Sequence, residues 1–292
     1  MPAPHLTISQ ITTTPLSLEQ ELALATRHGH ALELAEKKLP SAPQAASAAL
    51  QRIRDSGVEV VSLQPATLSP FPTTSQPTPA DRSMRIAALK ASIERFAPLW
   101  PGLPLVTNTG ALGGDENTVW DGCVEAYRDL AVHAERHGMR LALEALGPSL
   151  MNRNSILYTF GQAVEMVEAV DHPAFGLCLD LYNSWQDPRL LDALRDAGDR
   201  LWLVQLADWR RPRSLHDRRG LGEGRIPLAA MLDRIADTGY QGAYVLEIFS
   251  EQVADSYWAN PESIERVIAN SSGWFTRWAE HRRSEDCGQV SP

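Results

Sequence analysis

Cysteine is scarce in this chain, with three in 292 residues. The three stand far apart, at Cys123, Cys178 and Cys287, and this spacing excludes a cysteine-based zinc cluster. It also argues against a disulfide framework, which small secreted domains use to support a poor hydrophobic core. We therefore expect the protein in a reducing compartment, the cytoplasm.

Positive charge and long hydrophobic runs are also lacking. Asp and Glu (36) outnumber Lys and Arg (27), so the formal net charge is −9 at pH 7. This balance excludes the basic surface that nucleic acids and anionic membranes require. No apolar run approaches the ~20 residues that span a bilayer, and residues 1–14 lack the basic and apolar regions of a secretory signal. We expect neither a nucleic acid nor a membrane as a partner.

Short β-rich runs alternate with longer helical patterns along the whole sequence. Eight strands separated by helices pair in parallel through right-handed crossovers, and eight such strands close a (β/α)8 TIM barrel. A doubly wound sheet is the alternative, but its glycine-rich fingerprint after the first strand is missing. The expected strands lie within residues 5–12, 31–39, 58–66, 103–112, 140–148, 175–183, 201–209 and 242–250.

The predicted barrel accounts for nearly the whole chain as one α/β domain. Barrels of this length with 43% hydrophobic residues form a single core. We expect the domain over residues 1–283 and a flexible polar tail over 284–292.

Two loops on the mouth side of the barrel are unusual. Residues 65–80, rich in Pro, Ser and Thr, form either a lid or a rigid surface loop. Residues 209–226 form a basic loop of a length that is usually functional or disordered.

Four consecutive expected strands end an apolar run with one polar residue: Glu144, Asp180, Gln205 and Glu247. Any single one is as readily a rim residue or the partner of a nearby Lys or Arg. Neighbouring strands lie ~5 Å apart, however, so four such residues converge at the mouth of the barrel. Three converging carboxylates repel and raise one another's pKa values, and a divalent cation removes that conflict. We therefore predict one divalent metal ion bound by these four residues.

The motifs around these residues resemble those of the sugar phosphate isomerase/epimerase family, also called xylose-isomerase-like barrels. The family includes ketose 3-epimerases, inosose and 3-dehydroshikimate dehydratases, and endonuclease IV. Its pattern is a Glu ending strand five, D-x-x-H at strand six, H-x-x-D at strand seven and a Glu ending strand eight. Glu144, Asp180 and Glu247 match this pattern. The family's R-x-x-P-G-x-G stretch corresponds to residues 218–224, with Leu221 in place of Pro.

Two positions depart from the family pattern. Asn183 replaces the D-x-x-H histidine, and Gln205 replaces the histidine of strand seven. The glutamine resembles the VQLAD stretch of some dehydroshikimate dehydratases, which implies that the metal site survives as an all-oxygen set. Such a set suits Mn²⁺ or Mg²⁺, whereas imidazole suits Zn²⁺ or Co²⁺, and these two stay open as alternatives. The loss of the Asn183 imidazole puts any step that uses that histidine in doubt.

Further polar and aromatic residues follow the strands at the expected mouth. For Trp209, simple packing is an equal alternative to substrate contact, and His216 is open to interpretation as a free surface residue. The residues that we assign to substrate binding are Arg218, Asn108, Asn183, Trp209 and His216.

His133 and His137 lie four residues apart on an expected helix, which is the spacing of zinc-binding histidine pairs. They lack the Glu directly after the first His, so we interpret both as solvated surface histidines.

The resemblance implies proton-transfer chemistry on a sugar, keto sugar or cyclitol bound to the metal. The metal polarises a carbonyl and stabilises the enediolate that forms when the adjacent C–H loses its proton. Glu144 and Glu247 exchange protons on opposite faces of the substrate, which gives isomerisation or epimerisation. Arg218 holds a substrate hydroxyl or carboxylate, and Asp208 steadies its loop.

Three other functions are alternatives to this one. A lyase or dehydratase is the main alternative, because the same enolate expels a β-leaving group. A phosphodiesterase resembling endonuclease IV is disfavoured, since that chemistry needs a histidine-rich site with several zinc ions. A non-catalytic barrel subunit is the third. The substrate and the formation of a homo-oligomer stay open.

Overall fold

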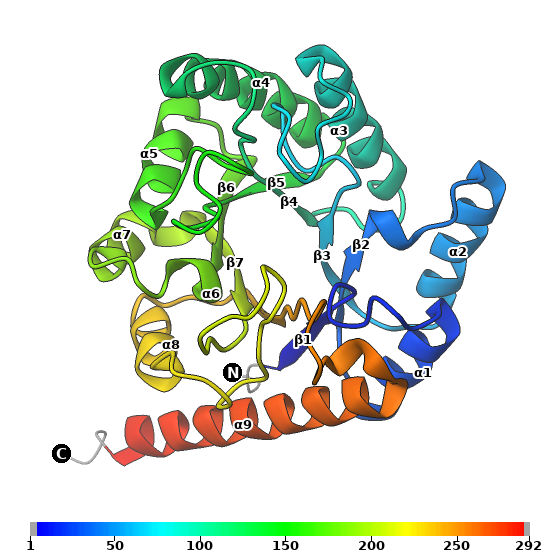
Figure 1. Ribbon diagram of the computed structural model, residues 1–292, viewed down its shortest axis with the longest axis vertical. Helices are drawn as coiled ribbons and strands as arrows, with labels where there is room; N and C mark the ends of the chain where they lie inside the picture. The colour runs from blue at the N-terminus through cyan, green and yellow to red at the C-terminus, as the bar shows by residue number, and fades with distance from the viewer. Residues whose placement is uncertain (1–4, 289–292) are drawn as a thin grey trace.

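Eight parallel strands close into a barrel in the computed structural model, which describes residues 5–288 (Figure 1). Each strand pairs with the next along the chain, and β8 pairs with β1. The predicted (β/α)8 TIM barrel is confirmed, and every strand lies within its expected residues. The strands are β1 (Leu6–Ser9), β2 (Leu32–Ala35), β3 (Val60–Gln64), β4 (Pro104–Thr107), β5 (Arg140–Glu144), β6 (Phe175–Asp180), β7 (Leu201–Leu206) and β8 (Ala243–Leu246).

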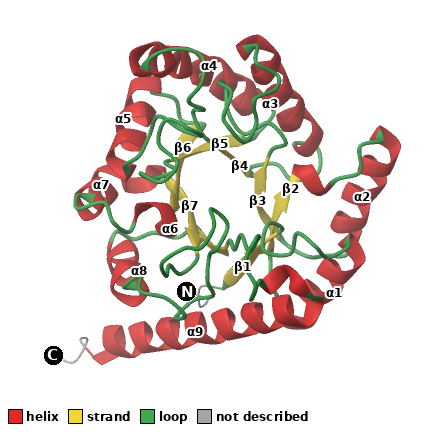
Figure 2. Ribbon diagram, viewed as in Figure 1, coloured by secondary structure: helices red, strands yellow, loops and turns green. Residues whose placement is uncertain are grey.

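Helices surround the barrel on its outside (Figure 2). Within the described residues, no helix is both long and apolar enough to cross a membrane. The α-helices are α1 (Leu18–His28), α2 (Pro43–Asp55), α3 (Arg82–Phe96), α4 (Glu116–Arg136), α5 (Phe160–Val170), α6 (Leu181–Ser184), α7 (Leu190–Ala197), α8 (Leu228–Asp237) and α9 (Pro261–Gly288). Short 3-10 helices are η1 (Glu36–Lys38), η2 (Gly198–Arg200) and η3 (Tyr257–Ala259).

Helix α9 extends past the expected end of the domain. It continues to Gly288 and so includes residues 284–288 of the expected tail. The rings of Phe275 and Trp278 on α9 pack against Tyr244 of β8, with centroids 5.3 and 5.9 Å apart. A helix anchored in this way propagates through polar residues at little cost, because each added residue gains one hydrogen bond. Residues 289–292 of the expected tail lie outside the described residues.

The barrel interior is layered, because side chains along a strand alternate between inside and outside. One layer is a small apolar cluster: Val106, Ala142, Cys178, Leu203 and Val245. Two residues further along the same five segments stand polar residues: Asn108, Glu144, Asp180, Gln205 and Glu247. The alternation therefore sets a polar layer above the apolar cluster, towards the carboxyl ends of the strands. Cys178 is fully buried in this cluster.

The loop of residues 65–80 is held from beneath by Arg85, whose side chain is fully buried. The Arg85 guanidinium donates to the carbonyl oxygens of Ser69 (2.8 Å), Gln76 (3.2 Å) and Pro79 (3.2 Å). It also donates to the Ser69 hydroxyl at 3.0 Å. Moving the loop away would leave a buried charged group unpaired, which is costly. These contacts favour the rigid-loop interpretation over the lid.

Candidate active site

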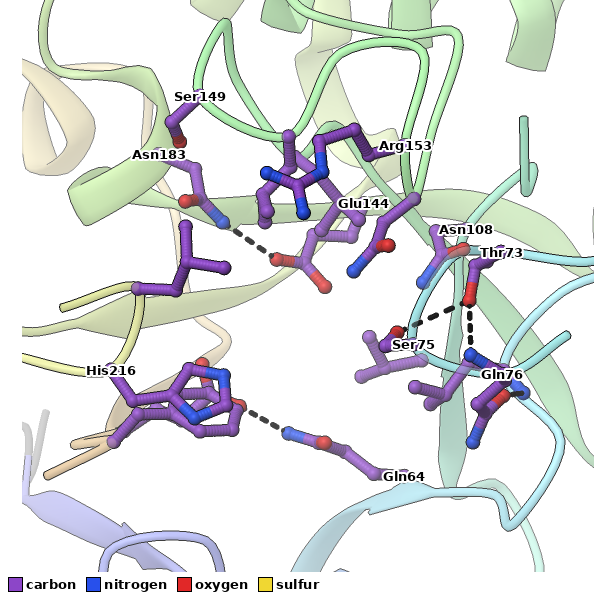
Figure 3. A pocket seen from close by; sticks show the side chains of 18 of the residues that line it. Gln64, Thr73, Ser75, Gln76, Asn108, Glu144, Ser149, Arg153, Asn183 and His216 are labelled. Carbon is purple, nitrogen blue, oxygen red and sulfur yellow. Dashed lines mark hydrogen bonds between the residues drawn. The ribbon is translucent and has the colours of Figure 1, made fainter. Parts of the chain in front are cut away.

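A pocket of about 550 Å³ opens at the carboxyl ends of the strands (Figure 3). Most of the predicted site residues line it: Asn108, Glu144, Asn183, His216, Arg218 and Glu247. Asp180 and Gln205 are fully buried and do not line the pocket. Both belong to the same polar layer as Glu144 and Glu247, which do line the pocket.

Trp209 is not among the residues that line this pocket, and its assignment to substrate binding stays a prediction. Its ring packs against Trp185, with centroids 5.4 Å apart. Its backbone N–H donates to the Asp208 carboxylate at 2.7 Å, and its carbonyl oxygen accepts from the Arg225 N–H at 2.8 Å. Both backbone groups are thus fixed, and the packing interpretation accounts for the position of the ring.

Arg218 lies between two of the predicted metal ligands. Its Nη2 is 2.7 Å from Oδ2 of Asp180, and its Nη1 is 2.9 Å from Oε2 of Glu247. The rings of Tyr182 and Phe249 lie against the guanidinium, 4.5 and 5.1 Å from its carbon. Arg218 therefore supplies positive charge at the place where the sequence predicts a metal ion.

Asn183 connects Asp180 with Glu144. Its Nδ2 donates to Oδ2 of Asp180 at 2.8 Å and to Oε1 of Glu144 at 3.2 Å. The chain after β5 approaches Asn183 closely: a Cβ on Gly147, where φ is +71°, would lie 2.3 Å from the Asn183 carbonyl oxygen. Where the family pattern has a histidine, this chain thus has an amide. An amide donates hydrogen bonds to both carboxylates but does not exchange a proton with a substrate.

Two residues of the polar layer are not among those predicted from the sequence: Glu33 in β2 and Gln64 at the end of β3. Glu33 is fully buried. It accepts hydrogen bonds from Ser62 (2.8 Å), Gln64 (3.0 Å) and Gln205 (3.1 Å). Gln64 also donates to Glu247. The signal for Glu33 is a lone acid within an apolar strand, the same signal that singles out the later carboxylates.

Glu33 orients the amide of Gln205. The Gln205 Nε2 lies 3.1 and 3.3 Å from the two carboxylate oxygens of Glu33. On the other side, Gln205 Oε1 is 3.5 Å from the thiol of Cys178, on the strand that also carries Asp180. Asp180 and Gln205 are paired in neighbouring strands. Because the nitrogen is committed to Glu33, the amide oxygen is turned towards β6, where it accepts from the Cys178 thiol.

The polar layer contains more carboxylates than positively charged side chains. Glu33, Glu144, Asp180 and Glu247 are each at most 9% exposed, and Arg218 is the one guanidinium among them. Burial, together with the nearby Asp180 charge, raises the pKa of Glu144 well above its usual value. Burial also raises the pKa of Glu33, and it raises that of Glu247 to about 7 although Arg218 opposes the shift. These oxygen donors and their unbalanced charge fit a hard divalent cation.

Proximity alone selects a different group of ligands. Glu94, His133 and His137 each offer one possible ligand atom, and these three atoms all lie within 4.8 Å of one another. Among the described residues, this is the one such group of His, Cys, Asp or Glu side chains. It joins α3 and α4 outside the barrel (Figure 1). Nε2 of His133 is 3.1 Å from Oε1 of Glu94, a distance for an ion pair but without hydrogen-bond geometry. The expectation of two solvated surface histidines is therefore wrong for His133, whose side chain is 17% exposed and whose Nε2 is buried.

Asp208 holds the loop that carries Arg218. The Asp208 carboxylate accepts hydrogen bonds from four backbone N–H groups: those of Trp209 (2.7 Å), Gly222 (3.1 Å), Gly224 (2.8 Å) and Ile226 (3.0 Å). A Cβ on Gly224 would lie 2.3 Å from Oδ1 of Asp208, so only glycine fits there. The loop is thus closed around one buried carboxylate, which fixes the backbone that leads to Arg218.

The departure from the family pattern at Leu221 has a structural explanation. Leu221 is 3% exposed and belongs to the main hydrophobic core. Its backbone N–H donates to the Ser271 hydroxyl on α9 at 3.1 Å. Proline has no N–H to donate. Leucine therefore ties the Arg218 loop to α9 through a hydrogen bond that the usual proline cannot make.

Residues 22–277 match the family described as xylose isomerase-like TIM barrel. The chain belongs to this family, as its motifs predict.

Three curated relatives are enzymes. The chain is 34% identical over 149 residues to a 3-dehydroshikimate dehydratase of Pseudomonas putida, covering 47% of this chain and 21% of that protein. It is 30% identical over 138 residues to a D-psicose 3-epimerase of Ruminiclostridium cellulolyticum, covering 46% and 43%. It is 31% identical over 157 residues to an inosose isomerase of Halalkalibacterium halodurans, covering 52% and 53%. The matches thus span about half or less of each relative.

Two solved structures show the same fold. A protein of Sinorhizobium meliloti superposes with a TM-score of 0.79 at 25% identity, covering 94% of this chain and 98% of that chain. The IolI protein, determined with a zinc atom bound, superposes with a TM-score of 0.73 at 19% identity, covering 95% and 98%.

Proposed function

We propose that the protein is a divalent-metal-dependent isomerase or epimerase that acts on a keto sugar or cyclitol. The observation that carries this proposal is the polar layer at the mouth, where Glu33, Glu144, Asp180 and Glu247 are buried and the Arg218 guanidinium pairs with two of them, Asp180 and Glu247. The epimerase and inosose isomerase among the relatives support the reaction class. Cys123 and Cys178 are free thiols, which agrees with the expected cytoplasmic setting.

The residues that would hold the cation are Glu144, Asp180, Gln205 and Glu247. When bound, a divalent cation polarises the substrate carbonyl next to the C–H bond that is broken. The all-oxygen set favours Mn²⁺ or Mg²⁺ over Zn²⁺ or Co²⁺. A bound cation would neutralise part of the charge of Asp180 and Glu247. Arg218 could then donate a hydrogen bond to a substrate hydroxyl.

Glu144 and Glu247 are the acid/base pair of this proposal. Both line the pocket, and the raised pKa of each allows it to hold a proton near neutral pH. They stand three strands apart in the ring, on β5 and just after β8, and so approach a substrate from two sides. One carboxylate removes the proton from the carbon beside the carbonyl. The other delivers a proton to the opposite face, which inverts that carbon.

A lyase is the second candidate. The 3-dehydroshikimate dehydratase among the relatives favours it, together with Gln205 in the VQLAD stretch. Here one glutamate removes the C–H proton and the other protonates the departing hydroxyl. The first half of the reaction is shared, so the two candidates use the same residues and differ in the product.

Metal content and product analysis test the proposal together. After loading with Mn²⁺, we expect about one equivalent of metal in the wild type and about a tenth or less in Asp180→Asn, because a lost carboxylate ligand weakens binding strongly. A panel of keto sugars and inososes should then give an epimer or isomer, whereas an unsaturated product would identify the lyase. Absence of both metal and turnover in the wild type would contradict the proposal.

A further inference from the structure

The wall of the pocket above Glu144 carries the positive charge of Arg153, whose guanidinium has no ion pair or hydrogen bond within the described residues. Lys37 also lines the pocket, on the side of Phe249, with Nζ 5.8 Å from the centroid of that ring. Figure 3 shows the Arg153 side chain directed into the pocket, above Glu144.

This positive wall stands out because the chain as a whole is acidic. Asp and Glu outnumber Lys and Arg by 36 to 27. Among the residues that line the pocket, the acids are Glu144 and Glu247, and both belong to the floor. The wall around Arg153 adds neutral donors, including Thr73, Ser75 and Asn108 (Figure 3). A group that binds at Arg153 meets positive charge and hydrogen-bond donors, with Glu144 beneath it.

The backbone beneath Arg153 is held in place. The Thr74 N–H donates to the Arg153 carbonyl oxygen at 2.8 Å, and the Thr74 hydroxyl donates to Oδ1 of Asn154 at 2.9 Å. These bonds join the Arg153 segment to the loop of residues 65–80, which the buried Arg85 fixes in turn. Little backbone freedom is then lost when a ligand binds, and such preorganisation favours affinity.

We propose that the substrate carries an anionic group, a carboxylate or a phosphate, that binds to Arg153 at the pocket wall while its carbonyl end faces Glu144 and Glu247. Lys37 adds a second positive charge to the same pocket. A guanidinium fork matches the oxygens of either anion with two parallel hydrogen bonds. The volume of about 550 Å³ lies within the range of small-molecule sites. This inference rests on the proposed function and narrows its substrate class.

Three ligands that share a polyol chain and differ in charge test how much the anionic group contributes to binding. D-glucitol, D-gluconate and D-glucitol phosphate are titrated calorimetrically into the Mn²⁺-loaded protein at low salt. We expect at least one charged ligand to bind about tenfold more tightly than D-glucitol, the gain of a charge-assisted pair. Arg153→Met should remove that preference and leave D-glucitol affinity within about twofold. Arg266→Met, a change at an exposed arginine on α9, is the matched control and should change nothing. The charged ligand that loses more affinity in Arg153→Met identifies the anion as carboxylate or phosphate.

The anion subsite is wrong if D-glucitol binds as tightly as both charged ligands, if neither charged ligand binds, or if Arg153→Met keeps the preference. Failure of the proposed function has a different signature. In that case Arg153-dependent binding of charged ligands persists, while no charged keto sugar exchanges its C–H hydrogen with D₂O. Turnover of neutral keto sugars that is unchanged in Arg153→Met would show the reverse, a correct function with no anion subsite.

Discussion

Two groups of possible metal ligands on this barrel differ in compactness and in burial. The outer group of Glu94, His133 and His137 brings its ligand atoms within 4.8 Å, and the Glu94 side chain is 55% exposed. The carboxylates at the mouth are buried instead, and Arg218 and Asn183 bridge them in pairs. Water solvates Glu94 of the outer group at little cost, whereas buried carboxylates need a compensating charge. Burial and unbalanced charge, more than proximity, mark the functional centre.

The largest expected effect is a loss of turnover in variants of the mouth carboxylates, with none in variants of the outer group. Glu144→Gln and Glu247→Gln should each lower turnover by at least ~10²-fold, the low end of a general acid–base contribution. Substrate affinity should fall less, because an amide oxygen can still face the cation. Glu94→Gln and His133→Ala are matched controls in the outer group and should leave turnover unchanged. Steady-state kinetics on the identified substrate check this, and equal losses in both groups would remove the distinction.

A smaller loss of activity is expected for Asp208, which holds the loop that carries Arg218. Asp208→Ala leaves four backbone N–H groups without their acceptor and frees the loop that carries Arg218. We expect kcat/KM to fall about tenfold or more, since unpaired buried groups and a misplaced Arg218 both cost free energy. The melting temperature should fall as well. A variant with unchanged kinetics would show that Asp208 does not position Arg218.

Glu33 tests whether the mouth binds metal through an oriented Gln205. Glu33→Gln removes one charge and replaces one of the two carboxylate oxygens that accept from the Gln205 amide with an NH2 donor. Loss of such a supporting partner typically costs about 10- to 100-fold in metal affinity, and we expect this range for Mn²⁺. Competition titration with a fluorescent chelator measures it. Wild-type affinity in the variant would mean that Gln205 is not a ligand or needs no orientation.

The pH dependence of stability should also differ between the mouth and the outer group. In the metal-free protein, burial raises the pKa of Glu247 from 4.5 to about 7. The folded state therefore retains a proton that the unfolded chain releases, so this contribution is present below pH 4.5 and is lost as the pH rises to about 7. Thermal melts of chelator-treated protein should show the loss, and Glu247→Gln should reduce it. A matched slope in both proteins would contradict the shift.

Much of the fold was readable from the sequence because it depends on local alternation and order. The eight strands and four residues of the polar layer follow from apolar runs that end in a polar side chain. The position of Arg218 between Asp180 and Glu247 does not follow, since a long loop brings it there through contacts to Asp208. The direction of the Trp209 ring depends likewise on backbone contacts. The length of α9 depends on aromatic packing against β8, which no local pattern of its polar end shows.

Hydrogen exchange with solvent tests most directly the claim that Glu144 and Glu247 move protons on two faces of one substrate. The substrate is incubated in D₂O with wild type, Glu144→Gln and Glu247→Gln, and the C–H signal beside the carbonyl is followed by NMR. In an epimerase, the wild type should exchange both epimers, and each variant should exchange one epimer, a different one in each, without converting it. In a lyase, exchange should vanish in just one variant. Near wild-type exchange and turnover in both variants would contradict the account, and His216 would then be the first residue to test as the base.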